Sequence, residues 1–307
     1  MILDQDLVPN DIPDYLPKMK SMYEDLFSGG KGYRGALVGA ISKDLGLHDE
    51  YAALLSRCIE YIHNSSLLHD DFVDGSELRR GKTAAWKKYS GGYAILGGDY
   101  LLAKVIKNLA DCDSIELISY TSQSILDLVE GEWLQDACHE RVDVTKSEME
   151  KVHSLKTSSL FAWCFKAPAL LAPNTTKEQL ESLFTIGEDL GALLQRSDDL
   201  LDYDIRNFEK KDYFRDLPSG YFNLFTIHLL EGRDEALKKK AFKIKNLETF
   251  LETFEIDLKN KLEAFDNESK IILNRVKKNI EKFDLFSDDF KRSLLEAAYT
   301  IYWRKSS

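Results

Sequence analysis

The sequence lacks the features of a secreted, membrane-spanning or disulfide-stabilised protein. Four cysteines occur in 307 residues, with neither CxxC pairing nor metal-ligand spacing, so we expect reduced thiols. No apolar run approaches the roughly 18 residues of a membrane span, and acids stand near the N-terminus where a targeting signal carries bases. These absences predict a soluble, cytoplasmic chain with no transmembrane segment.

Positive charge is also in short supply, since 41 Lys and Arg stand against 52 Asp and Glu, for a net charge of −11. This balance removes the broad electrostatic attraction that draws basic proteins to nucleic acids, and we expect no nucleic-acid partner. Any anion that binds must be held by a local cluster of bases.

Proline is scarce as well, with six residues in all and none between positions 18 and 167. Apolar side chains such as Leu55, Ile59 and Ile62 follow the helical period, and β-type alternation is hard to find. A composition of 44% hydrophobic and 30% charged residues is that of a globular protein. We therefore predict an all-α fold that forms a single domain over residues 1–307, with about residues 1–17 irregular.

Three carboxylates gather in the segment HDDFVDGSELRRG. On a helix, Asp70, Asp71 and Asp74 would project from one face near its C-terminal end, where like charge and the helix dipole both oppose them. A cation is needed to compensate. An EF-hand calcium loop is excluded, because Phe72 and Gly81 stand where ligands are required. A solvated acidic helix end would explain this cluster if it stood alone.

A second cluster, at Asp198, Asp199 and Asp202, repeats the DDxxD spacing on another amphipathic segment. Magnesium prefers oxygen ligands and is typically held by one or two carboxylates together with phosphate oxygens. Two facing DDxxD helices would therefore hold Mg²⁺ ions that in turn bind a diphosphate. Arg79 and Arg80 follow the first cluster directly, and their guanidinium groups suit phosphate oxygens.

These motifs resemble those of the trans-isoprenyl diphosphate synthases, the polyprenyl synthetase family. The resemblance extends through GGKGYRG (29–35), IHNSSLLHDDFVDGSELRRG (62–81), AILGGDYLL (94–102), EGE (130–132), LKTSSL (155–160), LLQRSDDLLD (193–202) and KKDYFRDLPSGYFNLFTIH (210–228). It implies an isoprenoid synthase domain, a helical bundle around a central cavity, with Mg²⁺ as cofactor. It also implies condensation of isopentenyl diphosphate with an allylic diphosphate, and a homodimer.

The resemblance assigns roles to individual residues of this sequence. The Mg²⁺ ions on the allylic diphosphate would be held by Asp70, Asp71, Asp74, Asp198, Asp199 and Asp202. Arg79, Lys156 and Lys211 would contact that diphosphate, and Thr157 and Gln195 would line the reacting centre. The diphosphate of isopentenyl diphosphate would be held by Lys31, Arg34, His63 and Arg80. Ile62, Ser65 and Ser66 would control product chain length.

Small residues at positions 65 and 66 would leave room for a growing prenyl chain, because an isoprene unit and a helical turn are both about 5 Å long. The resemblance therefore implies geranylgeranyl diphosphate as the product, made from dimethylallyl, geranyl or farnesyl diphosphate. A farnesyl or longer-chain synthase is the alternative within the family. A terpene cyclase would need no isopentenyl diphosphate, and its usual Asn/Ser/Glu-type second site is absent from this sequence.

Two bases that are usual in the family are missing here. Tyr221 stands where a lysine is expected on the allylic diphosphate, and Gly32 replaces a further base. A second hypothesis is therefore a weakly active regulatory subunit of a heteromeric synthase. The six retained carboxylates oppose it, because an inactive subunit has no reason to keep groups that repel one another.

Restoring a base at position 221 tests whether the missing cation matters. We expect Tyr221→Lys to lower the Michaelis constant for the allylic diphosphate, because a lysine adds a charge-assisted contact to phosphate oxygens. Steady-state kinetics on the full chain measure the change. An unchanged constant would mean that another base already occupies this role.

Overall fold

The computed structural model describes residues 12–27, 30, 32–203 and 214–302. The chain divides into two compact units: unit 1, Met1–Leu126 with Trp163–Phe184, and unit 2, Asp127–Ala162 with Thr185–Ser307. The division falls inside three helices, α6 (Ile115–Asp136), α8 (Ser159–Leu171) and α9 (Lys177–Leu201). Helices make up nearly all of the described secondary structure, which confirms the predicted all-α fold. The single domain over residues 1–307 stays a prediction.

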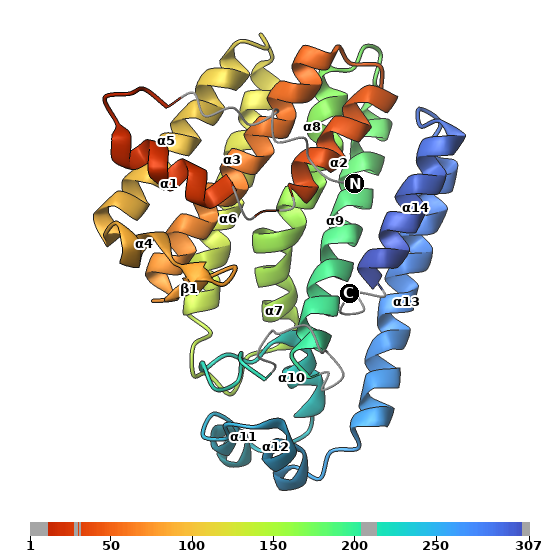
Figure 1. The fold of residues 1–307 in the computed structure, drawn as a ribbon. Coiled ribbons are helices and arrows are strands. Elements are labelled where there is room, and N and C mark those ends of the chain that lie inside the picture. The colour runs from red at the N-terminus through yellow and green to blue at the C-terminus, as the bar shows by residue number, and fades with distance from the viewer. Residues whose placement is uncertain (1–11, 28–29, 31, 204–213, 303–307) are drawn as a thin grey trace. The chain divides into compact units, whose positions relative to one another are not determined.

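Unit 1 consists of helices and one short hairpin (Figure 1). Its own elements are α1 (Pro17–Phe27), α2 (Tyr33–Asp44), α3 (Asp49–Val73), β1 (Leu78–Arg79), β2 (Lys82–Thr83), α4 (Ala85–Lys88) and α5 (Gly91–Ala110). Helix α3 packs most extensively against α5 and α2. Pro17 begins α1, where a missing backbone N–H costs nothing. The sequence did not predict the hairpin, in which Arg79 pairs with Lys82 in antiparallel register.

Unit 2 holds the C-terminal helices. Its own elements are α7 (Lys146–His153), the π-helical turn η2 (Ser154–Ser158), α10 (Leu224–Leu229), α11 (Glu235–Ala241), α12 (Leu247–Thr253), α13 (Leu258–Lys282) and α14 (Asp288–Tyr302). The long helices α13 and α14 lie side by side (Figure 1), and α10 contacts both α7 and α13. Thr145 and Glu148 form a complete capping box that fixes the start of α7.

Each unit has its own buried core. In unit 1 the Trp163 indole N–H donates to Thr121 Oγ1 at 2.9 Å, and both side chains are fully buried. In unit 2 a cluster of aromatic rings packs edge to face or tilted, and one of its members directly follows the second aspartate motif in the sequence. The rings are Tyr203, Phe214, Phe225, Phe250 and Phe265. These rings pack around the end of α9, where the second aspartate motif lies.

The described cysteines are buried thiols, and none forms a disulfide. Cys58, Cys112, Cys138 and Cys164 are all free and buried, and burial raises the pKa of Cys58 and Cys164 to about 12. Such thiols are unreactive near neutral pH.

Over the described ranges, no helix combines the length and the apolar character that crossing a membrane demands.

Two glycines let the helices of unit 2 approach closely. A Cβ at Gly187 of α9 would lie 2.5 Å from Ala162 Cα and 2.6 Å from the Phe161 carbonyl oxygen in α8. A Cβ at Gly191, one turn later, would lie 2.5 Å from Ser158 Cα. Both contacts are with backbone, which has no rotamer to move aside.

Gly187→Ala should therefore destabilise the protein. We expect the free energy of unfolding to fall by about 1–3 kcal/mol, because the added methyl overlaps the backbone of α8. Gly92→Ala in α5 is the matched control: it meets nothing within 4 Å and should be neutral or stabilising by up to about 1 kcal/mol. Urea unfolding measures both, and equal stabilities for the two variants would contradict the close approach.

Candidate active site

The first aspartate motif lies at the C-terminal end of α3, as its spacing predicts. Helix α3 ends at Val73, and Asp74 caps it by donating its backbone N–H to the Asp70 carbonyl at 2.8 Å. The Asp70 side chain is partly buried and that of Asp74 is exposed. These two carboxylates, four residues apart, lie on the same face of the chain.

Asp71 differs from its neighbours because it is buried and held by a base. Arg79 Nε lies 2.9 Å from Asp71 Oδ1 and 3.1 Å from Oδ2, and Arg79 Nη2 makes a further, very short contact with Oδ1. The Asp71 side chain is 5% exposed, against 39% for Arg79. This bidentate pair fixes the guanidinium of Arg79 beside the motif. Asp71 is thus more buried than Asp70 and Asp74, and the prediction that all three carboxylates project from one face stays a prediction.

Arg34 and His63, two of the four residues assigned to isopentenyl diphosphate, meet at the start of α2. Arg34 Nη1 lies 3.3 Å from His63 Nε2. Burial, and then the positive charges of Arg34 and Arg80, hold the pKa of His63 well below its usual value, so the ring is neutral near pH 7 and can accept from Arg34. Glu60 is buried nearby and accepts from the Gly35 backbone N–H at 2.8 Å. The structure thus brings Arg34, His63 and Arg80 into one electrostatic cluster.

Two predicted bases, Lys31 and Lys211, lie outside the described residues. Gly32, where the family's further base is missing, is the N-cap residue of α2 and has φ of 55°. This is the left-handed region, in which glycine is favoured over any side chain with a Cβ. The loss of a base at position 32 therefore has a backbone reason.

The three predicted chain-length residues face different surroundings. Ile62 and Ser65 are buried, and Ser65 Oγ donates to the Gly98 carbonyl of α5 at 2.9 Å. Ser66 is partly buried, and its Oγ donates to the His63 carbonyl at 2.9 Å. Ser66 stands one turn before Asp70 on the same face of α3, whereas Ser65 packs against α5.

The second aspartate motif lies in the last turn of α9. Asp198 is partly buried, while Asp199 is 2% exposed. Gln195 Nε2 donates to Asp199 Oδ1 at 3.0 Å, and the Leu224 backbone N–H donates to Oδ2 at 2.9 Å. Burial raises the pKa of Asp199 well above its usual value. Asp199 thus joins α9 to the start of α10, as Asp71 joins α3 to the hairpin.

Asp202, the last member of the motif, has a partner that the sequence did not reveal. The backbone N–H of Arg215 donates to Asp202 Oδ1 at 2.7 Å, and that of Asp216 lies 3.4 Å from Oδ2. Burial and the nearby Asp216 carboxylate raise the pKa of Asp202 to about 6. Asp216 itself accepts from Asn223 Nδ2 at 2.8 Å. A fourth carboxylate therefore belongs to this cluster, and only its place in the motif-bearing stretch 210–228 pointed to it.

A chain of hydrogen bonds joins three of the predicted residues. Thr157 Oγ1 in η2 donates to Gln195 Oε1 at 2.9 Å, and Gln195 in turn donates to Asp199. His153 Nε2 lies 3.8 Å from Asp199 Oδ2, and burial lowers the pKa of His153 to about 3. A neutral imidazole, which the sequence did not identify, thus completes the surroundings of Asp199.

Lys156 is held by an acid on the neighbouring helix. Its Nζ makes a very short ion pair with Glu132 Oε2 in α6, and the two side chains are 19% and 17% exposed. A Cβ at Gly131 would lie 2.7 Å from Lys156 Cγ, so glycine is what lets α6 approach η2. The EGE segment was noted in the sequence, but nothing in it identified Glu132 as the partner of Lys156.

Among the described residues, no group of three or more His, Cys, Asp or Glu side chains comes together to hold a metal ion. Mg²⁺ sites commonly use one or two carboxylates and complete their shell with water and phosphate oxygens. Asp70 with Asp74 in unit 1, and Asp198 with Asp202 in unit 2, supply oxygen donors of this kind.

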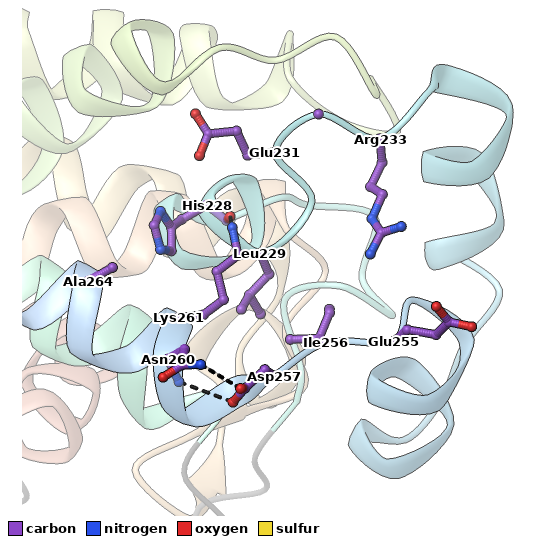
Figure 2. A pocket seen from close by; sticks show the side chains of 11 residues that line it. His228, Leu229, Glu231, Arg233, Glu255, Ile256, Asp257, Asn260, Lys261 and Ala264 are labelled. Carbon is purple, nitrogen blue, oxygen red and sulfur yellow. Dashed lines mark hydrogen bonds between the residues drawn. The ribbon is translucent and has the colours of Figure 1, made fainter.

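A cavity of about 570 Å³ in unit 2 lies apart from the predicted residues (Figure 2). It lies at the start of α13, where Lys261 Nζ donates to the His228 carbonyl at 3.0 Å and Arg233 donates to the Phe254 carbonyl at 2.6 Å. As far as the described residues go, no member of either aspartate motif lines it.

Tyr221, which stands where the family has a lysine, has a structural partner, since its ring packs edge to face on His139 with centroids 5.0 Å apart.

Removing the Glu132 carboxylate, the partner of Lys156, should destabilise the protein. We expect Glu132→Gln to lower the free energy of unfolding by about 1–3 kcal/mol, because it leaves a largely buried ammonium without its counter-charge. Glu130→Gln is the matched control, since Glu130 is exposed on the same helix. Urea unfolding compares the two, and equal stabilities would show that the ion pair contributes nothing measurable.

Comparison with known proteins adds an independent finding. A family model described as Polyprenyl synthetase matches residues 16–253. A prenyl transferase of Cyanophora paradoxa is 33% identical over 226 residues, which cover 72% of this chain and 70% of that protein. A geranylgeranyl diphosphate synthase of Methanosarcina mazei is 28% identical over 298 residues, 94% of this chain and 90% of that protein.

The fold also has solved counterparts. The polyprenyl synthase of Caulobacter crescentus CB15, complexed with calcium and isoprenyl diphosphate, has a TM-score of 0.82 and 25% identity, covering 98% of this chain and 92% of that one. Other relatives are named octaprenyl, solanesyl and decaprenyl diphosphate synthases, and the match to the solanesyl enzyme spans 48% of its length. Because the family model matches well over half of the sequence and covers both aspartate motifs, this chain belongs to the polyprenyl synthetase family of trans-prenyltransferases.

Proposed function

We propose that this protein is a magnesium-dependent synthase that condenses isopentenyl diphosphate with an allylic diphosphate to make geranylgeranyl diphosphate. The observation that carries the proposal is the shared construction of the two motifs. In each, one aspartate is buried against protein donors, Asp71 on Arg79 and Asp199 on Gln195, and the preceding aspartate is only partly buried. The preceding carboxylates, Asp70 and Asp198, are therefore the ones that we assign to a cation.

The residues divide between two diphosphates. Asp70, Asp74, Asp198 and Asp202 supply the oxygen donors for Mg²⁺ on the allylic diphosphate, and Asp71 and Asp199 support them. Arg79, Lys156 and Lys211 contact the same diphosphate. Lys31, Arg34, His63 and Arg80 hold isopentenyl diphosphate. Calcium and isoprenyl diphosphate in the Caulobacter crescentus relative support a divalent metal and a prenyl diphosphate as ligands of this fold.

The reaction needs no protein nucleophile. When bound, Mg²⁺ neutralises the charge that builds on the departing diphosphate oxygens. Arg79 and Lys156, each oriented by a carboxylate, add fixed positive charge at those oxygens. Thr157 and Gln195 are locked to one another beside the reacting centre. The double bond of isopentenyl diphosphate then attacks the allylic carbon, and the released diphosphate takes up the proton that is lost.

Product length is proposed from α3. Ser66 is a small residue one turn before Asp70 on the same face, which leaves that turn open to a prenyl chain. A relative similar over almost the whole chain is named geranylgeranyl diphosphate synthase. Other relatives are named as synthases of longer chains. A farnesyl or longer product is therefore the alternative, and the assay must distinguish it from geranylgeranyl diphosphate.

We also propose a cytoplasmic homodimer that works as a single domain. An apolar stripe runs along one face of α6, where Leu126, Val129 and Trp133 are 48%, 50% and 76% exposed. Large exposed side chains at helical spacing favour burial against a partner. The buried free thiols suit a reducing compartment.

The test incubates the purified full chain with Mg²⁺, radiolabelled isopentenyl diphosphate and each allylic primer, and separates products by chromatography. We expect geranylgeranyl diphosphate with a farnesyl primer, and loss of turnover when the metal is chelated. Asp70→Ala or Asp198→Ala should reduce turnover by about a thousandfold or more. Asp111→Ala, which changes an exposed aspartate outside both motifs, is the matched control and should behave as wild type.

Each alternative has its own result. Absence of turnover with every primer would favour the regulatory subunit. Hydrocarbon or alcohol released from an allylic diphosphate alone would indicate a terpene cyclase. Near-normal turnover in either aspartate variant would contradict the metal site.

A further inference from the structure

Arg196 is a buried base of α9 to which the proposed function assigns no role. It lies between Gln195 and Asp198 in the sequence and is 4% exposed. Arg196 Nε donates to Ser269 Oγ at 2.8 Å, and its Nη2 donates to the Phe265 carbonyl oxygen at 2.9 Å. Both acceptors belong to α13. Because a buried guanidinium is costly unless its donors are satisfied, these contacts with α13 are what stabilise Arg196 in this position.

Two further contacts hold the same guanidinium on α13. Arg196 Nη2 lies 3.1 Å from Glu268 Oε2, and the guanidinium carbon lies 3.8 Å from the centroid of the Phe265 ring. Glu268 also accepts from the Nζ of Lys146, the first residue of α7, at 2.8 Å. Helix α13 therefore joins the end of α9 to the start of α7.

Phe265 also reaches the second aspartate motif by another route. Its ring packs edge to face on Phe225 of α10, with centroids 5.0 Å apart. Phe225 directly follows Leu224, whose backbone N–H donates to Asp199 Oδ2 at 2.9 Å. One residue of α13 thus contacts Arg196, three positions before Asp199, and the ring that follows the backbone donor of Asp199. Groups that support ligand-bearing side chains in this way keep a site in its productive geometry.

We propose that Arg196 is a positioning residue, through which α13 holds the second aspartate motif in the geometry that binds metal. Arg196 acts through the backbone of α9 and through Phe265. Helix α13 begins beyond residues 16–253, which the family model matches, and it is then part of the support of the site. The effect on metal rests on the proposed function, whereas the positioning of α9 and α10 does not.

The charge and the contacts of Arg196 predict opposite effects on metal binding. A positive charge near carboxylates repels Mg²⁺, so its removal would strengthen metal binding if charge alone mattered. Loss of a group that supports metal ligands instead weakens metal binding, by about ten- to a hundredfold. We expect the second effect to be larger, because the charge of Arg196 is already paired with Glu268, whereas a methionine would not replace its hydrogen bonds to α13.

Hydrogen exchange on the full chain without metal tests the positioning itself. Arg196→Met removes the polar contacts with α13 and keeps a long unbranched side chain. We expect the backbone amides in the last turn of α9 and the first turn of α10 to exchange faster than in wild type. Ser269→Ala removes one acceptor of Arg196 and should have a smaller effect in the same direction. It provides the comparison if Arg196→Met does not fold.

Arg275→Met is the matched control. Arg275 also lies on α13 and pairs with α9, since its Nε donates to Asp189 Oδ2 at 2.7 Å. Asp189 lies earlier on α9 than the aspartate motif. This variant removes an ion pair between the same two helices, and it should leave exchange at the end of α9 and the start of α10 at the wild-type rate.

Titration calorimetry with Mg²⁺ in the presence of inorganic pyrophosphate measures the effect on metal. We expect Arg196→Met to weaken Mg²⁺ binding by about tenfold or more, and Arg275→Met to bind Mg²⁺ as wild type does. The Michaelis constant for isopentenyl diphosphate should be unchanged in both variants, because the residues assigned to that substrate belong to unit 1.

The outcomes separate the role of Arg196 from the proposed function. Equal exchange rates in Arg196→Met and Arg275→Met would overturn the positioning role, whatever the turnover. Tighter Mg²⁺ binding in Arg196→Met would overturn it as well, because the charge would then outweigh the contacts. A wild-type chain that neither binds Mg²⁺ with pyrophosphate nor turns over would reject the proposed function, and hydrogen exchange would still decide whether Arg196 holds the motif.

Discussion

Carboxylates one turn apart on a helix repel one another, and everything chemical in this protein depends on how that repulsion is contained. In both motifs the second aspartate is buried and accepts hydrogen bonds from donors of its own unit. Asp71 takes the bidentate guanidinium of Arg79, and Asp199 takes the amide of Gln195 and the backbone N–H of Leu224. The aspartates that stay exposed or partly exposed are thus fewer than the DDxxD pattern contains.

The same arrangement also places the bases. Arg79 is oriented by an acid of the motif, and Lys156 by Glu132, so each cation is held by a carboxylate. A guanidinium or ammonium that is already oriented loses little freedom when a phosphate binds. In a chain of net charge −11, these oriented bases are the ones that would hold the proposed diphosphate.

The helical fold and the place of the motifs could be predicted, because they depend on local patterns. Proline spacing and apolar period indicated helices. The first cluster was correctly predicted near the C-terminal end of a helix, now α3, and the second on an amphipathic helix, now α9. The partners could not be predicted. His153, Glu132 and Asp216 reach their sites through contacts between segments far apart in the sequence, for which spacing gives no signal. The bidentate pairing of Asp71 with Arg79 could not be predicted either, because Arg79 reaches it from a hairpin that the sequence did not predict.

The π-helical turn Ser154–Ser158 has a consequence for how this segment tolerates length changes. A π-turn accommodates one residue more than the α-helix would, and each residue advances a helix by about 100°. Deleting a single residue there would restore regular α-helical winding and rotate Lys156 and Thr157 away from Glu132 and Gln195 together. The segment is therefore one in which the number of residues, as much as their identity, is under constraint.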